Sequence, residues 1–175
     1  MKLAAAAALA LVCCCGLPVC ADEPDSVDPK CKELGKAYVL AKFGGPKDAL
    51  ESSLAEEIIL LPGHEYLKKE YGINPSGDRH KQVTVSRGKL IDLDQTAWKA
   101  LPDAKKQKIP DMLEKSVYTF VVALGEFTDA GGRLKLPTRY GDVVMKVQPK
   151  PTGDFLLYVL RRFDGQWKVV MDYTD

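Results

Sequence analysis

The dipeptide Asp164-Gly165 separates two long apolar runs near the C-terminus. An Asp-Gly pair in this setting predicts a two-residue hairpin turn of type I′, because both turn positions need positive φ. The turn fixes the register of the two strands. On one face we expect Arg162 opposite Trp167, Leu160 opposite Val169, Tyr158 opposite Met171 and Leu156 opposite Tyr173. On the other face we expect Arg161 opposite Lys168, Val159 opposite Val170 and Leu157 opposite Asp172.

Both faces of this predicted hairpin are largely apolar. A sheet with one side in water normally alternates apolar and polar side chains. We therefore expect helices to cover one face. The other face must be covered by a partner subunit or by the curl of the sheet around a cavity.

Helical patterns come before strand patterns along the chain. Asp28-Pro29 predicts an N-cap followed by proline at the first helical position. The apolar spacing that continues this helix is Cys31, Leu34, Ala37, Tyr38 and Ala41. Gly44-Gly45 ends that helix, and Pro46 starts a second one that includes Leu54. A third short helix is expected over residues 64–71, ending at Gly72.

Strand signals begin at Val83 and Val85, which alternate with polar residues. We expect a hairpin here, with a turn at residues 86–88 and a second strand through Leu90, Ile91 and Leu93. Residues 94–115 are helix-forming but contain Pro102 and Pro110, so they predict two short helical pieces. Their inward side chains are expected to be Trp98, Leu101, Ile109 and Leu113. Strands follow from Ser116, and the whole pattern predicts an α+β fold with a mainly antiparallel sheet.

The first 21 residues have the layout of a secretory signal peptide. A single lysine precedes an apolar run from Leu3 to Val12, and small residues stand at the expected cleavage site after Ala21. The run is shorter than the roughly 20 residues that a membrane-spanning helix needs. A lipoprotein signal with lipid on Cys20 is the alternative. We therefore expect residues 1–21 to be a signal, 22–28 a flexible leader and 29–175 one domain, exported to a periplasmic or extracellular space.

The charge balance argues against two classes of binding partner, and the cysteine positions indicate how the remaining thiol is used. The chain has 25 Lys and Arg against 24 Asp and Glu, which suggests neither nucleic acid nor an anionic membrane surface as a partner. Four of the five cysteines precede residue 22. The remaining one, Cys31, is interpreted as a small apolar residue on the inner face of the first helix. The alternative is a reactive thiol or an intermolecular disulfide.

The order of elements and the closing motif Asp164-Gly165-Gln166-Trp167 resemble the NTF2-like superfamily, with its SnoaL-like and ketosteroid-isomerase-like branches. The resemblance implies helices packed on a strongly curved antiparallel sheet, with a pocket between them and often a homodimer. It implies no single chemistry, since the fold serves both enzymes and binding domains. The segment 64–115 is long for the family and is expected to contain an insertion.

Candidate chemistry is sparse in the sequence. No common metal, nucleotide or nucleophile motif is present, so we expect no cofactor and no metal. His64 is a candidate acid or base, whereas His80 is expected in a solvated loop. The isomerases that the fold resembles need a pocket carboxylate and a tyrosine donor, and the candidates are Asp142 or Asp172 with Tyr118 or Tyr158.

Aromatic side chains are the residues we expect near any cavity. They are Tyr38, Trp98, Tyr118 and Tyr158. The sequence favours a non-enzymatic domain that binds a small apolar ligand or a protein partner. The alternative is an isomerase, dehydratase or cyclase that uses a pocket carboxylate.

Overall fold

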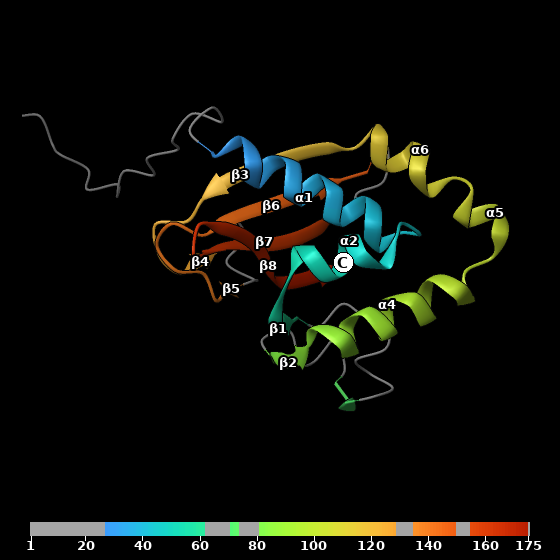
Figure 1. The fold of residues 1–175 in the computed structure, drawn as a ribbon, viewed down its shortest axis with the longest axis horizontal. Coiled ribbons are helices and arrows are strands. Elements are labelled where there is room, and N and C mark those ends of the chain that lie inside the picture. Colours follow the sequence, from blue (N-terminus) through green and yellow to red (C-terminus); the bar gives the residue numbers. More distant parts are fainter. Residues whose placement is uncertain (1–26, 62–70, 74–80, 129–134, 150–154, 175) are drawn as a thin grey trace, which may run out of the picture.

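The computed structural model describes residues 27–61, 71–73, 81–128, 135–149 and 155–174 of the chain (Figure 1). The described helices are α1 (Pro29–Lys42), α2 (Lys47–Ser53), α4 (Arg87–Ala100), α5 (Asp103–Lys106) and α6 (Ile109–Glu114). The described strands are β1 (Leu54–Leu60), β2 (Val83–Ser86), β3 (Val117–Val122), β4 (Phe127–Thr128), β5 (Lys135–Leu136), β6 (Val143–Gln148), β7 (Leu156–Phe163) and β8 (Gln166–Thr174). The predicted α+β class is confirmed.

The described strands form a six-stranded sheet in the order β2-β1-β8-β7-β6-β3. All neighbours are antiparallel except β1 and β8, which run parallel. Strands β4 and β5 form a separate two-stranded ribbon. Helices α1 and α2 contact β8, and α4 contacts β1, so these helices cover one face of the sheet (Figure 1). The predicted, mainly antiparallel sheet is also confirmed.

Helix α1 begins as its sequence predicts. Asp28 is the N-cap and accepts a hydrogen bond from the Lys30 backbone N–H at 2.9 Å. The other oxygen of Asp28 accepts from the indole N–H of Trp167 at 2.8 Å. The start of α1 is thereby joined to the C-terminal hairpin. Cys31 is fully buried on the inner face, and burial raises the pKa of its thiol to about 12.

Two elements differ from the sequence prediction. Leu54, expected in the second helix, starts strand β1 instead, because Ile58 and Leu60 are buried and the strand pairs with both β2 and β8. Ser86, expected in a hairpin turn, is the N-cap of α4 and accepts from the Lys89 N–H at 3.3 Å. The apolar residues from Leu90 onward therefore follow a helical period and not a second strand.

Residues 94–115, predicted to form two short helical pieces, are helical but in three parts: the second half of α4, then α5 after Pro102, then α6 with Pro110 in its first turn. Leu113 is buried as predicted, while Trp98, Leu101 and Ile109 are only half-buried. The predicted helix over residues 64–71 lies almost entirely outside the described residues, so the structure does not test it.

The C-terminal hairpin follows the predicted register only near its turn. Asp164 and Gly165 have φ values of 46° and 83°, as a type I′ turn requires. The predicted pairs are confirmed as far as Leu160 opposite Val169, where a β-bulge shifts the register. Beyond it, Val159 pairs with Met171, Tyr158 with Asp172, Leu157 with Tyr173 and Leu156 with Thr174.

The bulge overturns four predicted pairs, because one extra residue, Val170, is inserted in β8. The extra residue reverses the direction of every side chain that follows it. Asp172 therefore lies on the same face as Tyr158 and points toward the helices, whereas the regular alternation placed it on the opposite face.

The second face of the sheet is buried within the chain. Its core contains Leu157, Val159, Val170 and Met171, none of which exposes more than 6% of its surface. Leu61 and Leu136 also belong to this core, and Phe127 packs against it. A subunit interface is therefore not needed to cover these side chains.

A buried ion cluster beside a small cavity

The last residue of α1 carries a charge into the protein interior. The Lys42 side chain exposes 6% of its surface, and its Nζ lies 2.5 Å from Asp172 Oδ2. The same Nζ lies 3.7 Å from Asp94 Oδ1, and the Asp94 side chain exposes 5%. We call Lys42, Asp94 and Asp172 the buried ion cluster. The cluster joins α1, α4 and β8, three elements that are far apart in the sequence.

Two tyrosines pack against the buried ion cluster. The Tyr38 hydroxyl donates to Asp172 Oδ2 at 2.7 Å. Its ring meets the ring of Tyr158 edge to face, with centroids 5.3 Å apart. Lys42 Nζ is 5.8 Å from the Tyr158 ring centroid. Because Tyr38 and Lys42 are four residues apart on one helix, they share a face, and both reach Asp172.

The cluster holds its proton donors in the protonated form. Burial by itself would lower the pKa of the Lys42 ammonium, but the nearby charges of Asp172 and Asp94 raise this pKa above its ordinary value. Burial, together with the Asp172 charge, raises the pKa of Tyr38 well above its ordinary value. At neutral pH, Lys42 is therefore a cation and Tyr38 a neutral hydrogen-bond donor.

Local structure explains how each member of the buried ion cluster reaches this point. The bulge at Val170 turns Asp172 toward the helices. Asp94 lies four residues after Leu90, on the buried face of α4. Lys42 directly follows buried Ala41, at the end of α1. Each element thus carries one charged residue inward, and the ammonium of Lys42 lies between two carboxylates of opposite charge.

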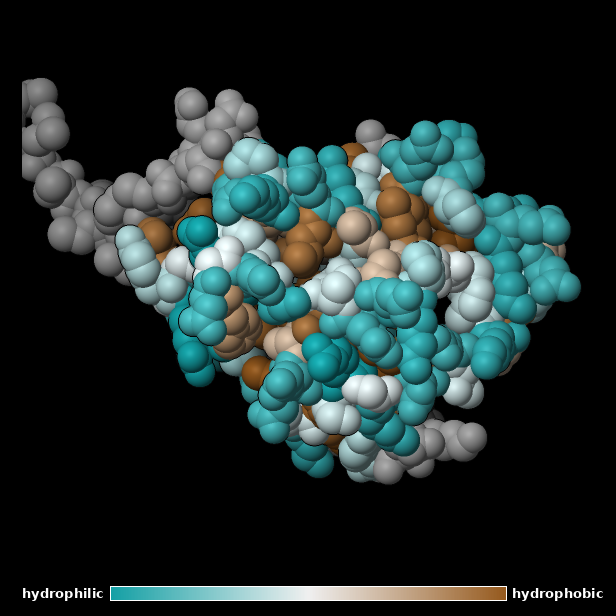
Figure 2. Space-filling view, in the orientation of Figure 1, coloured by the Kyte–Doolittle hydropathy of each residue, from teal (hydrophilic) through white to brown (hydrophobic). Residues whose placement is uncertain are grey.

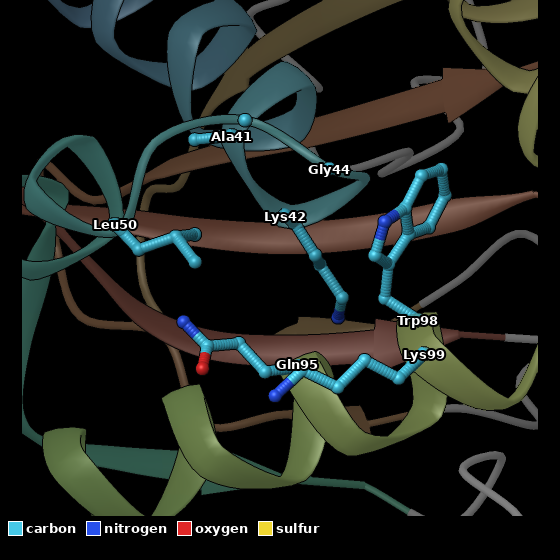
Figure 3. Close-up of a pocket in the computed structure, with 8 residues that line it drawn as sticks. Ala41, Lys42, Gly44, Leu50, Gln95, Trp98 and Lys99 are labelled. Atoms are coloured by element: carbon cyan, nitrogen blue, oxygen red, sulfur yellow. The ribbon is translucent and has the colours of Figure 1, made fainter.

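A cavity of about 240 Å³ lies beside the cluster, between the end of α1, the start of α2 and the second half of α4 (Figure 3). Its lining residues are Ala41, Lys42, Gly44, Gly45, Leu50, Gln95, Trp98 and Lys99. Gly44 has φ +99°, and a Cβ placed on it would lie 2.5 Å from Cζ2 of Trp98. Only glycine permits this close approach of the loop to the indole ring.

Three of the expected aromatics gather in this region. Trp98 lines the cavity, and Tyr38 and Tyr158 belong to the packing around the ion cluster. Tyr118 lies elsewhere, between β3 and α6, where its hydroxyl donates to the Leu113 carbonyl at 3.2 Å. Burial raises the pKa of the Tyr118 phenol.

The two candidate carboxylates, Asp142 and Asp172, are not brought together. Asp142 forms a two-point ion pair with Arg161, at 2.9 Å and 2.7 Å, and accepts from the Arg139 N–H at 2.8 Å. These contacts make it a brace between the loop before β6 and strand β7. His64 and His80 lie outside the described residues.

Sequence reasoning missed Lys42, Asp94 and Gln95. A lysine in the last turn of a helix is usually a solvated group that interacts with the helix dipole, so its position carried no sign of burial. The available signal was the spacing from Tyr38 to Lys42, which places the lysine on the buried face. Asp94 was missed because it stood at the predicted boundary between a strand ending at Leu93 and the helix-forming residues 94–115, where no buried face could be assigned to it.

The site offers a cation and hydrogen-bond donors and not a metal site. Among the described residues, no group of three His, Cys, Asp or Glu side chains is arranged to hold a metal ion. The raised pKa of Lys42 keeps the amine protonated, so it is unsuited to attack a carbonyl carbon. The arrangement can instead hold an acceptor group of a ligand against a fixed ammonium.

Comparisons with other proteins do not place this chain in a family. No model of a protein family matches it, and neither curated proteins nor solved structures give a significant match. Within the part of the chain that the structure describes, no helix has the length and apolar character needed to cross a membrane.

Proposed function

We propose that this chain is an exported NTF2-like domain that binds a small, largely apolar ligand and does not transform it. Support for the fold comes from the helices on one face of a mostly antiparallel sheet, together with the closing Asp164-Gly165 turn. Support for export comes from the signal-like first 21 residues of the sequence.

The cavity next to Trp98 is the observation that carries the binding proposal. Ala41, Leu50 and the indole of Trp98 supply apolar walls, and Lys42 and Gln95 supply polar groups. Few polar groups in an otherwise apolar concavity are typical of ligand sites. Its volume of about 240 Å³ is below the usual range for drug-sized ligands, roughly 300–1,000 Å³. A cavity of about 150 Å³ can accept a benzene ring, so the ligand is of one-ring size.

We propose binding without catalysis because neither candidate carboxylate, Asp172 or Asp142, is placed to remove a proton from a ligand in the cavity. A general base must come within about 2.6–3.2 Å of the proton that it removes. Asp172 is fully buried, accepts from both Lys42 and Tyr38, and is not part of the cavity lining. Asp142 is occupied by Arg161.

A cavity-filling variant tests the binding proposal. Gln95→Phe places an aromatic ring in the space beside Trp98, while Ala97→Phe adds the same ring on the exposed side of the same helix. We expect one-ring compounds to raise the melting temperature of the wild type and of Ala97→Phe but not of Gln95→Phe, since a ligand that binds only the folded state stabilises it. The proposal fails if a broad panel of such compounds raises none of the three melting temperatures.

An isomerase-type enzyme is the second candidate, favoured by the contact between the Tyr38 hydroxyl and Asp172. A carboxylate paired with a tyrosine donor is the kind of group that such enzymes use. Asp172→Asn should then abolish turnover of an identified substrate, while Asp142→Asn leaves turnover intact. Unchanged turnover in a folded Asp172→Asn protein would exclude this candidate.

A protein partner or a homodimer is supported by exposed apolar side chains at one end of the edge strand β3. Val121 exposes 38% of its surface, Leu124 55% and Tyr140 81%. On the face shown in Figure 2, hydrophobic residues appear as separate patches among hydrophilic ones. Sedimentation at micromolar concentration tests the dimer, and a monomer for both the wild type and Leu124→Ser would count against it.

A further inference from the structure

The few polar side chains of the cavity lining are mainly hydrogen-bond donors, and none of them is a carboxylate. Its polar side chains are Lys42, Gln95, the indole of Trp98 and Lys99, and only the Gln95 amide among them can accept. The two carboxylates of the buried ion cluster contact Lys42 but do not line the cavity. A ligand therefore meets the ammonium of Lys42 and not the carboxylates behind it.

Lys42 can donate to such a ligand without leaving its partners. An ammonium group has three N–H donors. Among the described residues, the carboxylates within ion-pair distance of Nζ belong to Asp172 and Asp94. These use two of the donors, and in the close-up the side chain of Lys42 extends between Gln95 and Trp98 (Figure 3).

Lys99 adds a second positive charge at the rim of the cavity, in the last turn of α4. With both lysines and both aspartates ionised, the charges of Lys42, Lys99, Asp94 and Asp172 sum to zero. The positive members are the ones that line the cavity. Because the lysines line the cavity and the aspartates do not, a bound ligand contacts the positive groups, and an anion fits these contacts better than a cation.

We infer that the ligand is a small carboxylate with an apolar body, held with that body against Trp98 and with its oxygens toward Lys42 and Lys99. This inference rests on the proposed function, because it names the chemical class of the ligand that this cavity accepts. The walls formed by Ala41 and Leu50 contact the apolar body. Charge-assisted hydrogen bonds to the carboxylate are stronger than those to a neutral acceptor.

Three probes of the same size and different charge test the inference by titration calorimetry of the protein. Sodium benzoate carries a carboxylate, benzamide a neutral acceptor and benzylamine a cation. We expect benzoate to bind about tenfold more tightly than benzamide, and benzylamine to give no measurable binding. The affinity for benzoate should also fall as salt is added, because part of the attraction is to the exposed Lys99.

Substitution of Lys42 would disturb the buried ion cluster and could unfold the protein. A substitution of Lys99, at the exposed edge of the cavity, tests the charge without this effect on folding. Lys99→Met should weaken benzoate binding about threefold and leave benzamide binding unchanged, since an exposed charge contributes modestly. Lys105→Met, at an exposed position in α5, is the matched control and should change neither.

The outcomes separate the two proposals. If benzamide or benzylamine binds as tightly as benzoate, the cavity binds ligands but the inferred class is wrong. If none of the three probes binds, the carboxylate inference is also wrong, and the thermal panel with Gln95→Phe then decides whether the cavity binds any ligand.

Discussion

The two faces of the sheet each bury one carboxylate and bind it to one cation, yet they do so in different ways. On the helix face, Asp172 is fully buried and contacts the flexible ammonium of Lys42, whose side chain exposes 6% of its surface. On the opposite face, Asp142 receives the planar guanidinium of Arg161, whose side chain exposes 16%. The first pair lies next to a cavity, and the second lies beside a turn.

Residue type alone therefore does not identify a functional site. Both aspartates were candidates because each lies in or next to a strand of the sheet. The guanidinium of Arg161 donates to both oxygens of Asp142, so we interpret this aspartate as a structural residue that connects the loop before β6 to strand β7. A single ammonium shared by Asp172 and Asp94 has a third N–H donor, which is why the proposed ligand site is on the helix face.

The largest expected effect is that of Asp172→Asn. The substitution leaves Lys42 buried with Asp94 as its remaining charged partner at 3.7 Å. Removal of one member of a buried ion pair costs about 3–5 kcal/mol of stability. We expect the free energy of unfolding, measured with urea, to fall by about this amount. A loss no greater than that of Asp142→Asn would show that the two pairs do not differ in the way that their burial indicates.

A smaller effect is expected from Asp142→Asn. Hydrogen bonds to charged groups contribute about 1.5–3 kcal/mol, and partial exposure of Arg161 reduces this to about 1–2 kcal/mol. Ligand binding should also distinguish Asp142 from Asp172. We expect Asp142→Asn to keep the thermal response to one-ring compounds, because Asp142 and Arg161 lie outside the cavity lining. Loss of that response in a folded Asp142→Asn protein would connect the brace to the site.

The parts of the fold that sequence predicted are those fixed by local signals. The Asp28 cap, the glycines after α1 and the Asp164-Gly165 turn each act within a few residues, and each is present in the structure. Strand β1 and helix α4 were missed because a short apolar run fits either element. The conformation of β1 is determined by its pairing with β2 and with β8, which is more than a hundred residues later in the chain.

The site was less predictable than the fold for the same reason. A single inserted residue, Val170, decides which face Asp172 occupies, and alternation along β8 gives no sign of a bulge. Lys42 and Asp94 are recognisable as a pair only after α1 and α4 are packed together. Trp98 and Tyr38 were identified because large aromatics near a core are expected to line its gaps.

The smallest change in the free energy of unfolding is expected from alkaline pH. The buried groups that titrate in this range lie on the helix face of the sheet, so the effect distinguishes that face from the opposite one. Cys31, on the helix face, has its pKa raised from 9.0 to about 12. A group whose pKa is raised by folding contributes fully below its unfolded pKa, and this contribution is lost as pH rises toward its folded pKa. Between pH 8 and 10 we expect the free energy of unfolding to fall by about 1 kcal/mol, and Cys31→Ala should remove this loss.

The pKa values of Tyr38 and Lys42 are also raised by folding, so these groups also reduce the free energy of unfolding as the pH rises. Their effect lies above pH 10, so stability continues to decrease there even in Cys31→Ala. On the opposite face, the hydrogen bonds from Arg161 to Asp142 raise the pKa of a guanidinium that already remains charged throughout this range. Urea unfolding of the wild type, Cys31→Ala and Asp142→Asn at pH 8, 9 and 10 measures the difference. Equal slopes for the wild type and Cys31→Ala, or a slope altered by Asp142→Asn, would mean that the helix face does not control alkaline stability.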